Sequence, residues 1–265
     1  MAFLRPALLT VTIAGILIFC AIWPPIPQDQ AYHQFADHRS CLGIPNCLNV
    51  LSNLSFAVAG IIGLVVVLTL RLGPTGLFLD PWERWPYVVF FIGAMVTTLG
   101  SGYYHLAPDN WRLVWDRLPM TLVFMGLLTA MIAERVGLSA GRLLLSPLVA
   151  GGLGSVLYWY WTELHGAGDL KAYIFVQYGS LGLLLLLILL YPARYSGTGY
   201  VFGACAAYVV AKGLEAFDQQ IFAVGHMVGG HTLKHGVAAG GIACIAFMLR
   251  ARRPCEPSQQ CGAAD

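Results

Sequence analysis

The hydrophobic pattern of this chain consists of long apolar runs separated by short polar segments. A helix needs about 20 apolar residues to cross a bilayer. Within the runs apolar residues follow one another without alternation, as at 183–190, which favours helices over strands. Eight runs approach or reach the length of a span: 6–24, 47–71, 86–106, 117–136, 143–162, 171–192, 199–217 and 231–250. The pattern therefore predicts an all-α, polytopic membrane bundle.

The first apolar run has some features of a secretory signal. Arg5 places a positive charge before it. The run ends at Trp23 and two prolines, however, and a cleavage site would need small residues there. We expect a retained helix and predict three regions: an additional N-terminal transmembrane helix at 1–30, a seven-helix core at 31–253, and a flexible cytoplasmic tail at 254–265.

Composition agrees with a membrane protein and argues against a nucleic-acid-binding one. The 265 residues are 58% hydrophobic and 11% charged, whereas about 25% of a soluble domain is charged. The formal net charge is only +2, and no basic run is interleaved with aromatic residues. We therefore expect the bilayer, and no nucleic acid, as a partner.

The distribution of basic residues predicts how the chain is oriented. With eight spans, nine of the 15 lysine and arginine residues fall on the side of the N-terminus. Basic residues next to spans are enriched on the cytoplasmic side. We expect a bacterial inner-membrane protein with both termini in the cytoplasm.

Three histidines occur at the edges of these apolar runs. His105 ends the third run, and His231 and His235 begin the eighth. Even numbers of crossings separate these points, so all three should lie near the periplasmic face. Ionisable residues at membrane depth are costly and mark functional sites by default. The predicted topology therefore brings three imidazoles to one depth.

The spacing of these histidines favours a metal site. His231 and His235 are four residues apart and share one face of a helix. A catalytic zinc usually has three protein ligands and a fourth position open to water, and His105 would be the third ligand. A single histidine at a helix end is more often an ordinary interfacial residue. The pair together with a third histidine at matching depth favours a metal.

Two other residues near His105 have both a catalytic and a structural interpretation. Asp116 begins the fourth run on the same side of the membrane. It could accept a proton from an activated water, or cap the helix N-terminus. Ser101 precedes His105 by one helical turn. Its hydroxyl could stabilise a developing oxyanion, or pack one helix against another.

The remaining polar residues near span ends are interpreted as structural. Lys212, Glu215 and Asp218, spaced three apart, are predicted to pair with one another. Cys41 and Cys47 share one loop region, where a disulfide can form outside the cytoplasm. The other histidines considered are weak ligand candidates or ordinary loop residues: His33, His38, His165 and His226.

The site residues together resemble those of a known family, the alkaline ceramidases. These belong to a superfamily of seven-helix membrane hydrolases that includes the adiponectin receptors. The segment 49–54 is similar to an Asn-x-x-Ser-Asn motif at the start of the ceramidase core, and the resemblance covers about residues 46–250. The other residues that carry it follow in the order Ser101-x3-His105, Asp116 and His231-x3-His235.

This resemblance implies a zinc-dependent amide hydrolase that acts on ceramide or another N-acyl lipid within the bilayer. It implies that the three histidines bind zinc, that Asp116 activates the water and that Ser101 completes the site. It also makes the first run an extra helix before a seven-helix core. Ceramidases have an acidic calcium-binding cluster before the core, but this chain has only Asp29 and Asp37 there, with Asn46 where an acid is expected. A calcium site is therefore doubtful.

The alternatives to a hydrolase are a zinc-stabilised receptor or pore, which the pattern allows, and a haem carrier, which fits it poorly. The same bundle could be a receptor or pore-like protein in which zinc only stabilises the fold, with Asp116 as a fourth ligand. A bis-histidine haem carrier needs opposed histidines on facing helices, which one HxxxH pair does not supply. The residues are compatible with either amide or ester cleavage and assign no oligomeric state.

Overall fold

The structure is a computed structural model that describes residues 4–69 and 78–255. In these two ranges it contains helices and no β-strand, apart from two isolated bridges. The predicted all-α class is therefore confirmed. The helices, in chain order, are α1 Leu4–Ile22, η1 Gln30–His33, α2 Cys47–Ser52, α3 Leu54–Thr69, η2 Pro81–Glu83, α4 Arg84–Leu106, α5 Asn110–Arg135, α6 Leu138–Leu164, α7 Lys171–Ile174, η3 Phe175–Gly179, α8 Ser180–Leu190, α9 Thr198–Ala216, α10 Asp218–Gly225 and α11 Gly230–Ala251.

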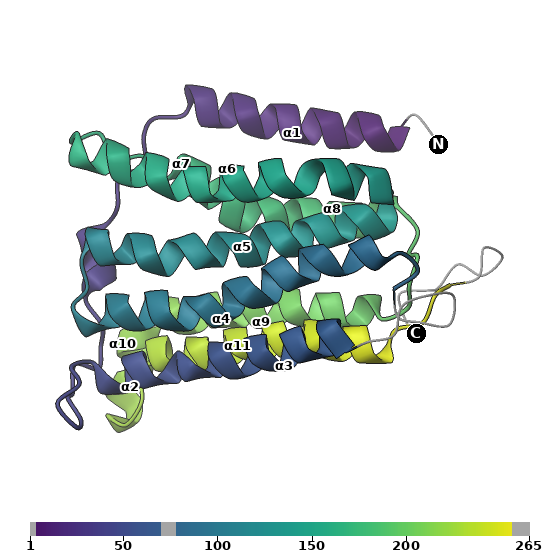
Figure 1. The fold of residues 1–265 in the computed structure, drawn as a ribbon. Helices are drawn as coiled ribbons and strands as arrows, with labels where there is room; N and C mark the ends of the chain where they lie inside the picture. Colours follow the sequence, from purple (N-terminus) through teal and green to yellow (C-terminus); the bar gives the residue numbers. More distant parts are fainter. Residues whose placement is uncertain (1–3, 70–77, 256–265) are drawn as a thin grey trace.

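The number of spans agrees with the apolar pattern. Across the described ranges, seven helical segments are long and apolar enough to cross a membrane, and an eighth is formed if α9 and α10 are one span bent by 70°. Such a chain is an integral membrane protein. The start of α1 and the end of α11 lie at the same end of the bundle (Figure 1), as an even number of crossings requires.

Helix α1 lies on the outside of the bundle. None of its residues is buried, and it lies along one outer edge of the bundle (Figure 1). The segment after it is held to the core: the Leu170 amide donates to the Ile26 carbonyl at 2.8 Å, and Lys171 Nζ donates to the Trp23 carbonyl. At the other end of α1, the Arg5 guanidinium lies 5.8 Å from the centroid of the Tyr191 ring.

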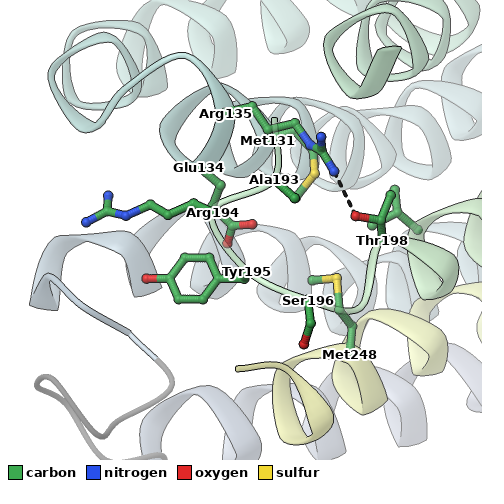
Figure 2. Close-up of a pocket in the computed structure, with 10 residues that line it drawn as sticks. Met131, Glu134, Arg135, Ala193, Arg194, Tyr195, Ser196, Thr198 and Met248 are labelled. Carbon is green, nitrogen blue, oxygen red and sulfur yellow. Dashed lines mark hydrogen bonds between the residues drawn. The ribbon is translucent and has the colours of Figure 1, made fainter. Parts of the chain in front are cut away.

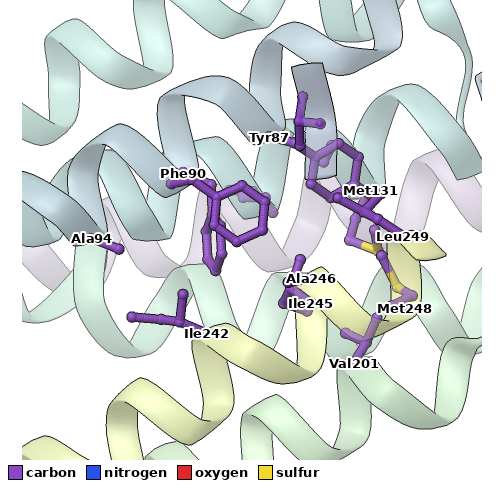
Figure 3. Close-up of a cluster of buried hydrophobic side chains, with 14 of the residues drawn as sticks. Tyr87, Phe90, Ala94, Met131, Val201, Ile242, Ile245, Ala246, Met248 and Leu249 are labelled. Carbon is purple, nitrogen blue, oxygen red and sulfur yellow. The ribbon is translucent and has the colours of Figure 1, made fainter. Parts of the chain in front are cut away.

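The main hydrophobic core lies between α4, α5, α9 and α11. Figure 3 shows its centre, where Tyr87 and Phe90 of α4 face Ile245 and Leu249 of α11. Phe91, Ile245 and Leu249 have no measurable exposure. A smaller aromatic cluster, which includes Phe35 and Trp159, fills the other end of the bundle. The histidines lie toward this second end.

A close contact between α4 and α5 depends on one glycine. A Cβ at Gly100 would lie 2.0 Å from the carbonyl oxygen of Trp115 and 3.4 Å from the amide nitrogen of Asp116. Only a residue without a Cβ allows the two backbones to approach this closely. Gly100 therefore brings the turn that carries Asp116 against the turn that carries Ser101.

Several boundaries differ from the predicted runs. The run 47–71 is interrupted at Asn53, which separates α2 from α3. Its last two residues lie outside the described ranges, and one of them is Arg71, which was counted among the basic residues. The run 171–192 contains one π-helical turn, η3. Helix α5 begins at Asn110, seven residues before the run 117–136. Most of the predicted tail, 256–265, also lies outside the described residues.

Candidate metal centre

The three predicted histidines form one buried cluster. His105 is in the last turn of α4, and His231 and His235 are in the first two turns of α11. Their exposed fractions are 1%, 4% and 3%. One ring nitrogen from each lies within 4.8 Å of the others, and the ring centroids are 4.8 to 5.3 Å apart. The predicted convergence of the three imidazoles is confirmed.

The hydrogen bonding of this cluster indicates a metal site. Both ring nitrogens of His105 and Nε2 of His231 are buried without a hydrogen-bond partner among the described residues. A buried polar atom without a partner costs about 1–3 kcal/mol. These rings do not form hydrogen bonds with one another. A metal ion, in contrast, can accept a lone pair from each of several neutral imidazoles at once. The buried three-histidine group can therefore hold a metal ion.

Ser52 orients the third imidazole. Its hydroxyl donates to the Asn49 carbonyl at 3.1 Å and lies 2.7 Å from Nδ1 of His235. A serine hydroxyl has one proton, so with that proton on the Asn49 carbonyl the Ser52 oxygen would accept from Nδ1–H. The lone pair of Nε2 is then free to bind a metal, which is how hydrogen-bond partners commonly fix a ligand's tautomer. The sequence identified Ser52 only as part of the Asn-x-x-Ser-Asn motif, without this role.

Replacing Ser52 with alanine should weaken metal binding by about 10–100-fold, because His235 would lose the bond that fixes its tautomer. Competition with a chelator of known affinity would measure this change. Ser55→Ala is the matched control, since the Ser55 hydroxyl bonds only to the carbonyls of Ser52 and His235. Equal metal affinities for both variants would contradict the orienting role.

The beginning of α11 is fixed by Asp218. One carboxylate oxygen accepts from the His231 amide and the other from the Ala36 amide, each at 2.8 Å. A negative charge is favourable at a helix N-terminus, where amide groups lack partners. Gly230 allows the start of α11 to lie close to Leu214 of α9, because a Cβ at this position would lie 2.1 Å from the Leu214 carbonyl oxygen. The prediction that Asp218 pairs with Lys212 is therefore wrong: it anchors the turn that carries His231.

A lysine pair lies beside the histidines. Lys212 pairs with Glu215 as predicted, and Lys234, which was not assigned a partner, pairs with the same carboxylate. The Tyr32 hydroxyl also donates to Glu215 at 3.1 Å. Burial, and then the charge of Glu215, raise the pKa of Tyr32, so it remains a donor. Lys234 lies between His231 and His235 in sequence, so this charge cluster adjoins the candidate metal centre.

Asp116 and Ser101 are both buried and lie together beside Gly100. Their exposed fractions are 7% and 3%, and the close approach at Gly100 brings the turns that carry them together. Asp116 is not a helix cap, because α5 starts at Asn110 and Asp109 caps it by accepting from the Arg112 amide at 2.7 Å. Asp116 is also outside the group of converging ligand atoms.

The loop before α2 covers the histidines. The ring of Phe35 lies 4.7 Å from that of His105 and 4.5 Å from that of His231, measured between centroids. The Asn46 amide donates to the His105 carbonyl at 2.9 Å, next to a disulfide between Cys41 and Cys47. The sequence left this pairing open. The apolar ring of Phe35, on this loop, therefore packs against two of the three imidazoles.

The acidic residues of this loop are engaged in local bonds. Asp29 accepts from the Ala31 amide and caps η1. Asp37 pairs with Arg39, whose guanidinium lowers the pKa of that carboxyl. The two histidines on either side of Asp37 lie outside the cluster: His33 bonds to the Tyr104 hydroxyl at 3.0 Å, and His38 to Asn46 at 3.3 Å. Neither is a ligand candidate in the structure.

A separate small pocket opens near the other end of the bundle. Figure 2 shows that Arg135 reaches across it to Thr198, at 2.8 Å. Arg135 also donates to the Tyr191 carbonyl at 2.8 Å, so its guanidinium links α5 to the segment after α8. None of the five predicted site residues lines this pocket. Its polar groups hold helix ends together.

Comparisons with protein-family models, curated proteins and solved structures find no match to this chain. The resemblance to the alkaline ceramidases therefore stays a prediction from the residues quoted above.

Proposed function

We propose that this protein is a zinc-dependent intramembrane hydrolase that cleaves the amide bond of a ceramide-like or other N-acyl lipid. The observation that carries this proposal is the ring of His105, which is buried with both nitrogens unpartnered and faces two further histidines. A purely structural histidine at this depth would have a hydrogen-bond partner.

The donor set fits zinc better than other common ions. Calcium and magnesium prefer oxygen ligands, whereas zinc binds imidazole nitrogen. Three protein ligands are typical of catalytic zinc sites, and His105, His231 and His235 would hold the ion. When bound, zinc would supply a Lewis acid that makes a water acidic enough to act as a nucleophile near neutral pH.

Asp116 would handle the proton in this reaction. Its carboxylate is buried on a turn that packs against α4, the helix that carries His105, and it is not among the converging ligand atoms, which suits a general base rather than a ligand. It would take the proton of the attacking water and return it to the amide nitrogen as the carbon–nitrogen bond breaks. Ser101, on the adjoining turn of α4, would donate a hydrogen bond to this carboxylate and hold it in place. The products would be a fatty acid and an amine.

The position of the cluster suits a lipid substrate. His105 is at the end of one span and His231 at the start of another, so the site lies near one face of the membrane. The amide of an N-acyl lipid occupies the same depth, at the boundary between head group and acyl chain. Exposed apolar side chains on the surrounding helices would contact the acyl chain.

The proposal is tested by metal analysis of the purified protein together with mass spectrometry of N-acyl lipids before and after incubation. We expect bound zinc and release of free fatty acid, and loss of both in His231→Ala. Full hydrolysis by metal-free His231→Ala would refute the mechanism. Zinc without hydrolysis would instead favour the zinc-stabilised receptor or pore.

A further inference from the structure

Arg117 is a buried cation that lacks an anionic partner. Three basic residues are buried in the described part of the chain. Lys171 pairs with Asp169 and Arg252 pairs with Glu134, but no carboxylate described here lies within ion-pair distance of Arg117. Buried charges are normally paired, because removing an ion from water is costly. Arg117 therefore stands out among the buried cations.

Aromatic rings surround the guanidinium and define a cage, made of Tyr32, Trp159 and Tyr173. Its central carbon lies 5.7, 4.3 and 4.8 Å from the respective ring centroids. Cation–π contacts satisfy the face of a guanidinium, but its N–H groups still require acceptors in the plane. Among the described residues the one acceptor for these groups is Gln28, whose side-chain oxygen lies 2.7 Å from Nη2.

Two donors in this cage have no acceptor. Nη1 of Arg117 and the indole nitrogen of Trp159 are both buried without a hydrogen-bond partner among the described residues. The Trp159 side chain has no measurable exposure, and Arg117 is 6% exposed. Both unsatisfied groups are donors, and one belongs to a cation. The chemistry that would satisfy them is a negatively charged oxygen.

The cage adjoins the candidate metal centre. Arg117 follows Asp116 directly on α5. Tyr32 contacts the guanidinium with its ring and donates its hydroxyl to Glu215, which pairs with Lys234. The lysine pair shares the Glu215 carboxylate, so Arg117 cannot take Glu215 as an ion-pair partner of its own.

We propose that the Arg117 cage binds the carboxylate or phosphate of the substrate's head group, so that the enzyme selects acidic N-acyl lipids over neutral ones. This inference rests on the proposed hydrolase function and names its substrate class. The lipid's anionic oxygens would accept from Nη1 of Arg117 and from the indole N–H of Trp159, while its amide reaches the histidine cluster.

The test compares two lipids that differ in one group, N-palmitoylglycine and N-palmitoylethanolamine, with the zinc-loaded protein in nanodiscs. We expect kcat/KM for palmitate release to favour the glycine conjugate by about tenfold or more, the scale of one charge-assisted hydrogen bond. Arg117→Gln should abolish the preference. Arg112→Gln, one turn earlier on α5 and paired with Asp109, should keep it. Equal rates for both lipids in the wild-type protein would overturn the substrate class and leave the hydrolase proposal standing.

A second variant covers the case in which Arg117→Gln does not fold. Trp159→Phe keeps an aromatic ring in the cage but removes the unpartnered N–H together with the five-membered ring of the indole, so a purely structural role predicts lower stability with an unchanged lipid preference. We expect it to lower the preference for the glycine conjugate, and an unchanged preference would contradict the cage as a binding site.

Lipid binding separates the two proposals. The glycine conjugate should raise Tm more than the ethanolamine conjugate in the wild-type protein, and Arg117→Gln should remove that difference. This shift without any hydrolysis would support the cage and count against the hydrolase. An equal shift from inorganic phosphate alone would overturn the assignment to a lipid head group.

Discussion

Replacing His105 with leucine should remove the bound metal and abolish hydrolysis. The wild-type protein is expected to bind about one zinc ion per chain, and the variant close to none, because two histidines do not complete a three-ligand site. Leucine is apolar and of similar size, so packing against Phe35 should be largely kept. Metal content by mass spectrometry and palmitate release would be measured on the same preparation.

The stability of His105→Leu separates a metal ligand from a structural histidine. In excess chelator the variant should unfold at the same temperature as the wild-type protein or higher, because leucine removes two unpartnered buried nitrogens that each cost about 1–3 kcal/mol. With zinc present the order should reverse. His165→Ala is the control: this exposed histidine bonds to its own helix, and its loss should leave metal content unchanged. A variant that keeps its zinc would refute the site.

The helices could be predicted because each must bury a long apolar stretch in lipid. Their irregularities could not. The first turns of α5 contain Asn110, Arg112 and Asp116, so the apolar run begins after the helix does. The bend between α9 and α10 follows from Asp218 bonding to two backbone amides of other segments. That pairing depends on tertiary contacts, and its local sequence suggested an ion pair instead.

The histidine site could be predicted in outline because topology limits which residues share a membrane face. Three histidines at two span ends on one side of the membrane had few other places to lie. The partners that orient them were less visible. Ser52 bonds to His235 from 183 positions away, and Phe35 covers two rings from a loop. The partner of Lys234 could also have been predicted. A lysine in an apolar span needs an anion, and Glu215 was already expected to form an ion pair.

Asp116→Asn should separate proton transfer from metal binding. Because Asp116 lies outside the converging ligand atoms, the variant should keep its zinc. Asparagine can accept the Ser101 bond but cannot take a proton, so turnover should fall by about 10²–10⁴-fold, the usual contribution of a general base. Metal content and palmitate release, measured side by side, check both expectations.

The control for this variant is Asp109→Asn, on the same helix. Asp109 caps α5 and pairs with Arg112 near the surface, and asparagine is also a good cap, so metal content and turnover should change little. Two results would reject the role of Asp116. Zinc-loaded Asp116→Asn with wild-type turnover would mean that another group accepts the proton. Loss of zinc from this variant would make Asp116 a fourth ligand, and a closed four-ligand site is the arrangement expected of a zinc-stabilised receptor or pore rather than a hydrolase.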